Sequence, residues 1–309
     1  MNLIPVTSQE TYGFSLDFKS GFLYGTAYEI IYPDSFSSCY LSELQWNLKP
    51  LYFAGIYSEY APKNPVEKIG FYGSVELTLG LPMKTGVMED RDWLTEAEIP
   101  GSLTLFSSHE NDTKTAILAD LKLGFSLPLV EFFFMRLYLG FSYMYYKIEA
   151  LNGYIQYGDN VTPPYSPWDP EWPKIPVSGL GVDYSQHFFL FYPGLEFCLK
   201  TKKTMLNIGI SVSPLIGCIT IDNHYMRYPS FKIKSYLSGG LFAEPKIKLK
   251  FNFHGNFSAG LAFSYRYISG MRGNAEQKNN LTGVTTNHYD ISGAEFKAVL
   301  GELLIGFSY

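Results

Sequence analysis

Two short segments of this chain place ionisable side chains two residues apart. One reads Met-Glu-Asp-Arg-Asp-Trp from Met88, and the other reads Asp-Asn-His-Tyr from Asp222. In extended backbone, residues two apart point to the same face, so Asp90 can lie beside Asp92, and Asp222 beside His224. Three carboxylates and one imidazole that converge could activate a water molecule, because a positioned histidine is the usual general base.

Each segment also has a simpler interpretation. An Asp-x-Asp in a loop is commonly a solvated turn or a calcium ligand, and an Asp-x-His-Tyr is often only a polar strand end. The chain repeats Asn-His-Tyr at 287–289 without an acid two residues before the histidine. We therefore interpret His288 as a plain loop histidine. His109, His187 and His254 have no partner pattern either.

Two other chemistries are disfavoured by the motifs. Ser107 lies near His109, but no nucleophile-elbow sequence surrounds it. The chain also has no HExxH or comparable ligand set, so we expect no metal and no cofactor. Three well-separated cysteines, Cys39, Cys198 and Cys218, have no CxxC or zinc spacing, and we expect buried unpaired thiols.

The composition restricts the class of protein. Aromatic residues make up 17% of the 309 residues, and charged residues also make up 17%. A typical soluble domain has roughly 25% charged residues. The net charge of −5 and the lack of a basic stripe argue against a nucleic-acid partner and favour a cationic substrate.

Alternation with a period of two dominates the sequence. From Phe14 to Glu29, even positions are mostly aromatic or apolar, and odd positions are polar or small. The pattern recurs over 41–49 and 136–146. Apolar-out and polar-in alternation with aromatic girdles is typical of a transmembrane β-barrel. We therefore predict an all-β fold, a single barrel domain over 1–309 made of about ten antiparallel strands.

Short and long connections alternate along the predicted barrel. We expect strands at 12–31, 39–59, 66–83, 113–127, 133–149, 184–199, 204–221, 229–251, 257–270 and 292–309. Short turns then fall near 60–65, 128–132, 200–203 and 252–256. Long loops fall near 32–38, 84–112, 150–183, 222–228 and 271–291, and in such barrels the long loops lie outside the cell.

One strand changes its inward-facing parity near Pro214. Polar residues are odd before it, as at Ser211, and interior-type residues are even after it, as at Thr220. A proline inside a strand suggests a bulge, which moves every later side chain to the opposite face. We predict a bulge there that turns Asp222 and His224 inward.

The N-terminus lacks the positive region and apolar run of a secretory signal. Because the rest of the chain indicates an outer-membrane barrel, we expect a mature form with an added start methionine. No stretch is apolar enough for a membrane helix, since Leu123–Tyr146 is interrupted by Pro128, Glu131 and Arg136.

With these motifs in place, the chain resembles the omptins, ten-stranded outer-membrane proteases of Gram-negative bacteria. The matching pieces are Leu-Ser-Glu-Leu-Gln-Trp from Leu41 and the two segments from Met88 and Asp222, in family order along nearly the whole chain. The resemblance implies that the catalytic residues are Asp90, Asp92, Asp222 and His224. In this assignment Asp222 orients His224, and a water lies between His224 and Asp90, with Asp92 supporting Asp90.

The resemblance also implies an acidic pocket for a basic residue, and here the chain departs from the family. Glu29 matches one pocket glutamate, and Met88 and Thr220 also fall at substrate-binding positions. Relatives carry a second acid where this chain has Thr220, and an acid on the far side of the cleaved bond where it has Leu105. We expect cleavage near Arg or Lys that is less strict than in relatives, with an apolar residue accepted after the bond.

Relatives also require lipopolysaccharide, held by basic residues on the outer face. The corresponding positions here are Tyr145 and His187, so either the outer-membrane lipid is unusual or activity is independent of lipopolysaccharide. The expected partners are peptide or protein substrates and outer-membrane lipid, and we expect a monomer whose active site faces outside. The competing functions are a catalytically weak adhesin or receptor, and a passive pore, which ten strands make too narrow.

Overall fold

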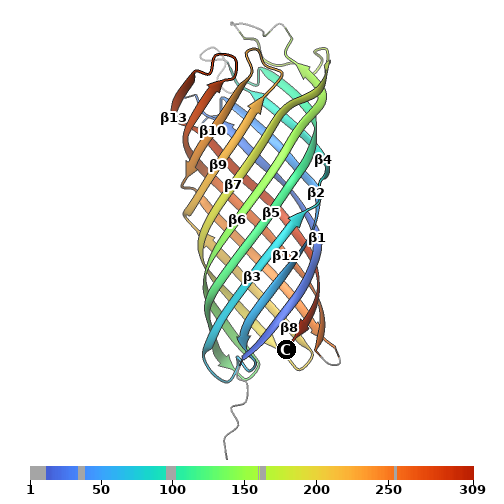
Figure 1. The fold of residues 1–309 in the computed structure, drawn as a ribbon, viewed down its shortest axis with the longest axis vertical. Coiled ribbons are helices and arrows are strands. Elements are labelled where there is room, and N and C mark those ends of the chain that lie inside the picture. Colours follow the sequence, from blue (N-terminus) through green and yellow to red (C-terminus); the bar gives the residue numbers. More distant parts are fainter. Residues whose placement is uncertain (1–11, 34–38, 95–101, 159, 161–164, 254–255) are drawn as a thin grey trace, which may run out of the picture.

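The computed structural model describes residues 12–33, 39–94, 102–158, 160, 165–253 and 256–309. These residues form one closed antiparallel β-barrel (Figure 1). Its thirteen strand segments make a ring of ten strands, because three pairs of segments continue one another. The segments are β1 (Tyr12–Ile31), β2 (Ser42–Pro62), β3 (Gly70–Gly80), β4 (Met83–Asp92), β5 (Leu105–Val130), β6 (Phe133–Gln156), β7 (Ile175–Lys200), β8 (Thr204–Ser213), β9 (Leu215–His224), β10 (Phe231–Ser238), β11 (Leu241–Asn252), β12 (Phe257–Asn279) and β13 (Thr285–Ser308).

The ring closes by pairing the first strand with the last. β1 and β13 are in register from Ser15 opposite Ser308 to Ile31 opposite Ser292, and each other strand pairs with its neighbours in sequence. The continuous pairs are β3 with β4, β8 with β9, and β10 with β11. Closure leaves no sheet edge unpaired, which a membrane barrel requires. The prediction of an all-β barrel of ten strands is confirmed. No helix among the described residues has the length and apolarity to cross a bilayer.

The strands run further than the sequence predicted, so three of the expected long loops are wrong. β4 continues to Asp92 where a loop over 84–112 was expected, and β5 already begins at Leu105. The expected loops 150–183 and 271–291 are likewise shortened, by the ends of β6, β7, β12 and β13. Asp90 and Asp92 are therefore held by a strand rather than by a loop, which fixes the direction of both side chains.

The half of the barrel that carries the C-terminus, at the bottom of Figure 1, has an apolar outer face and a charged interior. On β1, Phe18 is 64% exposed whereas its neighbour Asp17 is 1% exposed. Inside, Lys19 bridges Glu76 and Glu302 with N–O distances of 2.6 Å to each. This is the polarity that the sequence predicted, since the outer face contacts lipid and the interior charges are paired.

The other half has the reverse polarity, which the sequence analysis did not anticipate. Leu44, Trp46 and Leu48 face inward and are buried, whereas Glu43 and Gln45 face outward. The interpretation of 41–49 as another apolar-out segment is therefore wrong. A barrel that extends beyond the membrane needs a polar exterior and a packed apolar interior, as in a soluble protein.

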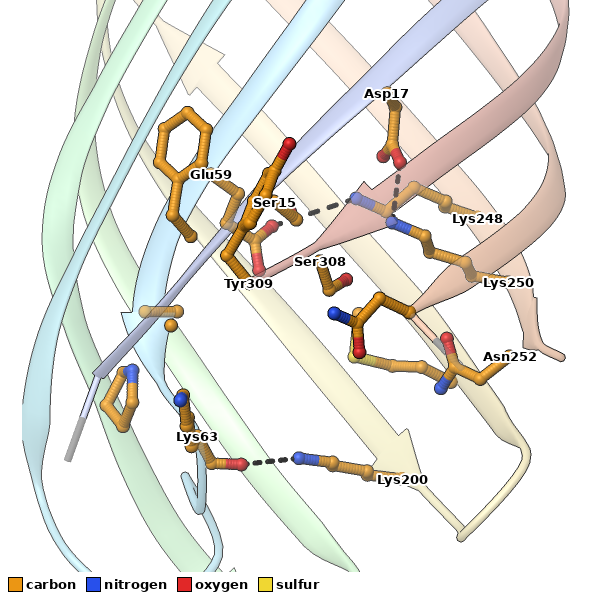
Figure 2. Close-up of a pocket in the computed structure, with 16 residues that line it drawn as sticks. Ser15, Asp17, Glu59, Lys63, Lys200, Lys248, Lys250, Asn252, Ser308 and Tyr309 are labelled. Atoms are coloured by element: carbon orange, nitrogen blue, oxygen red, sulfur yellow. Dashed lines mark hydrogen bonds and ion pairs between the residues drawn. The ribbon is translucent and has the colours of Figure 1, made fainter. Parts of the chain in front are cut away.

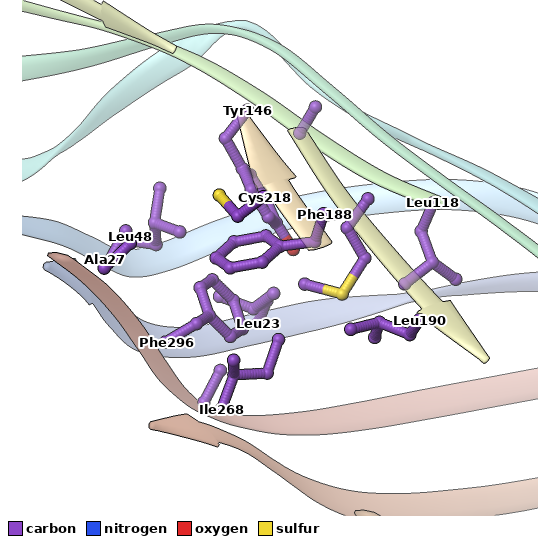
Figure 3. Close-up of a cluster of buried hydrophobic side chains, with 14 of the residues drawn as sticks. Leu23, Ala27, Leu48, Leu118, Tyr146, Phe188, Leu190, Cys218, Ile268 and Phe296 are labelled. Atoms are coloured by element: carbon purple, nitrogen blue, oxygen red, sulfur yellow. The ribbon is translucent and has the colours of Figure 1, made fainter. Parts of the chain in front are cut away.

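An apolar cluster fills the interior of this polar-surfaced half. Figure 3 shows Phe188 and Phe296 packed together, with ring centroids 6.1 Å apart, among side chains from several strands. Tyr146 stacks on Phe296 with centroids 5.2 Å apart. Trp46 and Tyr184 stack at 5.1 Å, also inside the barrel. This core supports the strand ends above it and fills the lumen.

A cavity of about 350 Å³ opens at the end of the barrel where the chain terminates (Figure 2). Its charged groups are largely engaged with one another. Lys250 Nζ lies 2.6 Å from a carboxylate oxygen of Asp17, and Lys200 Nζ donates to the carbonyl oxygen of Lys63 at 2.7 Å. The cavity lies at the opposite end of the barrel from β4 and β9, whose last residues carry the candidate catalytic groups.

The predicted bulge at Pro214 is confirmed. Against β7, Gly194 pairs with Ser211 on one side of Pro214, and Phe191 pairs with Leu215 on the other. Between these two pairs, two residues of β7 lie opposite three residues of the other strand, which therefore has one extra residue. Ser211 and Ser213 are buried before the bulge, and Thr220 and Asp222 are buried after it. The bulge thus turns Asp222 inward, as the change of parity predicted.

The cysteines agree with expectation in part. Cys198 and Cys218 are buried and form no disulfide. Cys39 is exposed, contrary to the expectation of a buried thiol, because it lies in the connection between β1 and β2.

Candidate active site

β4 supplies the first group of site residues. Met88, Asp90 and Asp92 alternate with outward-facing Glu89 and Arg91, so all three point into the barrel and are buried. β4 is held between two strands. Asp90 lies opposite Leu44 of β2 on one side, and opposite Ser107 of β5 on the other. The backbone on both sides therefore fixes the position of the aspartate pair.

β9 supplies the aspartate–histidine pair. His224 Nε2 is hydrogen-bonded to Asp222 Oδ2, and the Asp222 side chain is almost fully buried. The imidazole lies against the ring of Phe231 on β10, with centroids 4.5 Å apart. Because Asp222 engages Nε2, Nδ1 is the nitrogen left to face another group. The arrangement has the form of a carboxylate that orients a general base.

One cavity of about 240 Å³ brings the two segments together. Asp90 and His224 both line it, although 134 positions separate them in the sequence. The full lining comprises Met88, Asp90, Ser107, His109, Ile155, Tyr157, Val177, Gly181, Val182, His224, Met226 and Arg227. Asp92 and Asp222 are not among the lining residues, and each is two positions from a lining residue on its own strand.

The acidic groups of the site perturb one another. Burial and the negative charge of Asp92 raise the pKa of Asp90 to about 7, against the opposing positive charges of Arg227 and His224. Burial also raises the pKa of Asp92, while a hydrogen bond from Ser42 lowers it. Perturbed carboxylates of this kind are concentrated at functional sites.

Three buried carboxylate oxygens at this end of the barrel have no hydrogen-bond partner among the described residues. They are Asp90 Oδ1, Asp222 Oδ1 and Glu29 Oε2. An unpaired buried oxygen is costly, and native proteins usually satisfy it with water, an ion or a bound ligand. These oxygens can therefore accept hydrogen bonds from a polar or cationic group.

Glu29 and Thr220 are the residues that the sequence assigned to a specificity pocket. Both side chains are buried, on β1 and β9 respectively. Burial and the negative charges of Asp222 and Asp90 raise the pKa of Glu29 well above its usual value. The Glu29 carboxylate thus lies near the candidate catalytic residues Asp90 and Asp222, and Thr220 has the same inward direction as Asp222.

Leu105 is buried opposite Asp92, at the start of β5. It places an apolar side chain beside the aspartate pair. Tyr145 and His187 pair with each other on the outer face, and their rings are 4.5 Å apart. His187 Nδ1 is also 2.9 Å from the hydroxyl of Tyr143.

Ser107 and His109, which the sequence motifs disfavoured as a nucleophile and base, both line the cavity. Ser107 Oγ lies 3.1 Å from His109 Nε2, and His109 Nδ1 lies 3.2 Å from the carbonyl oxygen of Asn152. The alternation of β5 was the available signal, because Ser107 and His109 are two residues apart and share the inward face. No carboxylate is hydrogen-bonded to His109 within the described residues, so this pair lacks the orienting acid that His224 has.

His288 is not a loop residue, in contrast to the sequence interpretation. It lies on β13, and its Nε2 is 3.2 Å from Oε1 of Gln277 on β12. The expected loop 271–291 is instead a hairpin that extends beyond the apolar half of the barrel. His254 lies outside the described residues. Among the described residues, no group of three or more histidine, cysteine, aspartate or glutamate side chains is arranged to hold a metal ion.

The closed ring of ten strands and the buried acidic site at its end define the class as an outer-membrane β-barrel. The crystal structure of the outer membrane protease OmpT from Escherichia coli matches it with a TM-score of 0.86 and 16% identity, covering 98% of this chain and 100% of that one. The toluene transporter TodX of P. putida covers 97% of this chain and 90% of its own, at 10% identity. Its TM-score of 0.34 is too low to carry an argument. Sequence comparison with curated proteins gives no match.

The omptin family model matches residues 10–309. The chain therefore belongs to the omptin family. Membership of this family makes it an outer-membrane protease, as the resemblance in the two acidic segments implied.

Proposed function

We propose that this chain is an endopeptidase that cleaves peptide bonds next to basic residues, with its active site at the outward-facing end of the barrel. The observation that carries the proposal is the shared cavity of Asp90 and His224, with Asp222 bonded to the histidine. Cleavage of a fluorogenic peptide by the wild type but not by a His224→Ala variant is the expected result that tests it.

The proposed reaction uses water as the nucleophile. Asp222 holds His224 so that Nδ1 accepts a proton from a water bound between the imidazole and Asp90. The water oxygen adds to the carbonyl carbon of the peptide bond. The carbon–nitrogen bond then breaks, and the leaving nitrogen takes the proton back from His224. Asp92 keeps Asp90 in place and raises its proton affinity.

A cationic side chain is the proposed specificity element. A lysine or arginine side chain would place its charge at Glu29 and satisfy the unpaired Oε2 oxygen. Thr220 supplies no second charge, so the preference is expected to be weaker than with two carboxylates. Buried Leu105 favours an apolar residue on the other side of the bond.

The rate of cleavage is expected to fall as the pH drops below about 7. Asp90 must be ionised to hold the attacking water, and burial together with Asp92 raises its pKa to about 7. Below that pH the carboxyl is protonated, and its electrostatic attraction for the water and the imidazolium is lost. A profile of kcat/KM between pH 5 and 9 measures this. A rate that stays constant down to pH 5 would contradict the role of Asp90.

Cleavage in detergent is expected to proceed without added lipopolysaccharide. The outer-face positions at Tyr145 and His187 form a contact between two rings, with no fixed positive charge to hold a lipid phosphate. Rates measured in detergent with and without added lipopolysaccharide should agree within about twofold. A strict requirement for the lipid would overturn this expectation. We also expect the protein to be a monomer in the same detergent preparation.

The alternative function, an adhesin or receptor with little catalysis, has less support. Such a barrel would need no buried, unpaired carboxylate oxygens at Asp90 and Asp222. A passive pore is disfavoured by the filled interior, where the apolar cluster and the ion pairs of Lys19 occupy the lumen.

A further inference from the structure

The proposed reaction leaves one charge unaccounted for. When water adds to a peptide bond, the carbonyl oxygen becomes an oxyanion, and donors placed around it are commonly a large part of catalysis. Asp90, Asp92 and Asp222 all carry the same sign as this oxyanion. A positive group is therefore needed on the side of the peptide bond that faces away from these carboxylates.

Arg227 is the lysine or arginine that lines the cavity within the described residues. It lies three positions after His224, in the connection between β9 and β10, and shares the cavity with His224 and Asp90. The connection is tied to the barrel by the backbone N–H of Tyr225, which donates to the carbonyl oxygen of Gly181 at 2.9 Å. The arginine is thus attached directly to the strand that carries the general base.

Arg227 is exposed, whereas Asp90, Asp92 and Asp222 are buried. Its charge reaches all three carboxylates. No direct ion pair among the described residues holds the guanidinium, so its N–H donors are available to a ligand. A peptide bond in the cavity would lie between the arginine on the solvent side and the carboxylates on the inner side.

We propose that Arg227 contacts the carbonyl oxygen of the scissile peptide bond and stabilises the oxyanion. This inference rests on the proposed function. As the water oxygen bonds to the carbonyl carbon and its proton passes to His224, the carbonyl electron pair moves onto oxygen and is met by the guanidinium. When the pair returns, the carbon–nitrogen bond breaks, and nitrogen receives the proton from His224. Atoms and charges balance without a further reactant.

Two other roles for the same arginine predict different results. If the guanidinium occupied the acidic site in place of a substrate side chain, removing it would accelerate cleavage. If it acted only by keeping Asp90 ionised, removing it would move the low-pH limb of the rate profile to higher pH. The rate at high pH would then equal that of the wild type.

The experiment compares the wild type with Arg227→Gln and Arg227→Lys on a fluorogenic peptide that contains one arginine, over pH 5 to 9. The expected result for Arg227→Gln is a fall in kcat of about 10²–10³ at every pH, with KM changed less than threefold. Arg227→Lys should recover part of the loss. Lys232→Gln is the matched control, because Lys232 is an outward-facing cation on the same hairpin, and it should not change kcat.

An unchanged or faster Arg227→Gln enzyme would overturn the inference, as would a loss confined to low pH. A His224→Ala variant in the same assay separates this inference from the proposed function. Cleavage by the wild type but not by His224→Ala upholds the proposed function whatever Arg227→Gln does. Absence of cleavage by the wild type overturns both.

Discussion

Replacing Asp222 by asparagine is expected to lower kcat about 10³–10⁴-fold while the barrel remains folded. The carboxylate accepts a hydrogen bond from His224 Nε2, which leaves Nδ1 free to take a proton. An asparagine amide that donates to Nε2 would instead place the proton on Nδ1, so the imidazole could not act as a base. Steady-state rates on a peptide with one arginine measure the loss.

The neighbouring residue provides the control for this variant. Asn223 faces outward on the same strand, where its Nδ2 is 3.3 Å from Asp183 Oδ1. Asn223→Ala should cleave at the wild-type rate. If Asp222→Asn kept its activity within tenfold of the wild type, the role of Asp222 in orienting His224 would be wrong.

The second large effect concerns selectivity. Glu29→Gln is expected to reduce the preference for arginine over a neutral residue before the cleaved bond by about 10- to 100-fold. A hydrogen bond to a charged group contributes roughly 1.5–3 kcal/mol, and each 1.4 kcal/mol is about a factor of ten. Thr220→Asp should raise the preference by a similar factor, because it adds a carboxylate on the inward face of β9.

A peptide library that varies the residue before the bond measures both variants. Glu110→Gln is the control, since Glu110 is an exposed acid paired with Lys84 at 2.7 Å on the outer surface. The preference of Glu110→Gln for arginine before the cleaved bond should equal that of the wild type. If the wild type and Glu29→Gln cut arginine and neutral peptides with the same relative rates, Glu29 does not form the pocket.

Much of the fold could be predicted because strand alternation is a local property. The parity change at Pro214 located a bulge that is visible in the pairing with β7. The alternation at Asp17 and Phe18 correctly separated lumen from lipid. These patterns need no knowledge of distant contacts, since each strand carries its own inward and outward faces.

The prediction failed where the surroundings of the barrel change. Beyond the membrane, Trp46 and Leu48 turn inward although the same alternation continues, because water replaces lipid outside. Alternation alone gives two faces but does not say which one contacts lipid. The strand expected at 66–83 continues as β4 to Asp92, and His288, which was assigned to a loop, lies on β13.

The candidate site was predicted as separate pieces rather than as a whole. The spacing of Asp222 and His224 indicated their shared face, and the structure brings them to the cavity that Asp90 also lines. Arg227 could not be found in this way, since it reaches the cavity through its place in the connection between β9 and β10. Such a residue can be assigned to the site only from the three-dimensional structure, in which the strands are brought together.

Cleavage of a fluorogenic peptide that contains one arginine, by the wild type and by His224→Ala, tests the central claim most directly. A general base contributes about 10²–10⁴-fold, so His224→Ala should lose at least 10²-fold in kcat. His288→Ala is the matched control, because its histidine follows the same Asn-His-Tyr pattern without an orienting acid, and it should cleave at the wild-type rate. Equal rates for the wild type and His224→Ala would contradict the account.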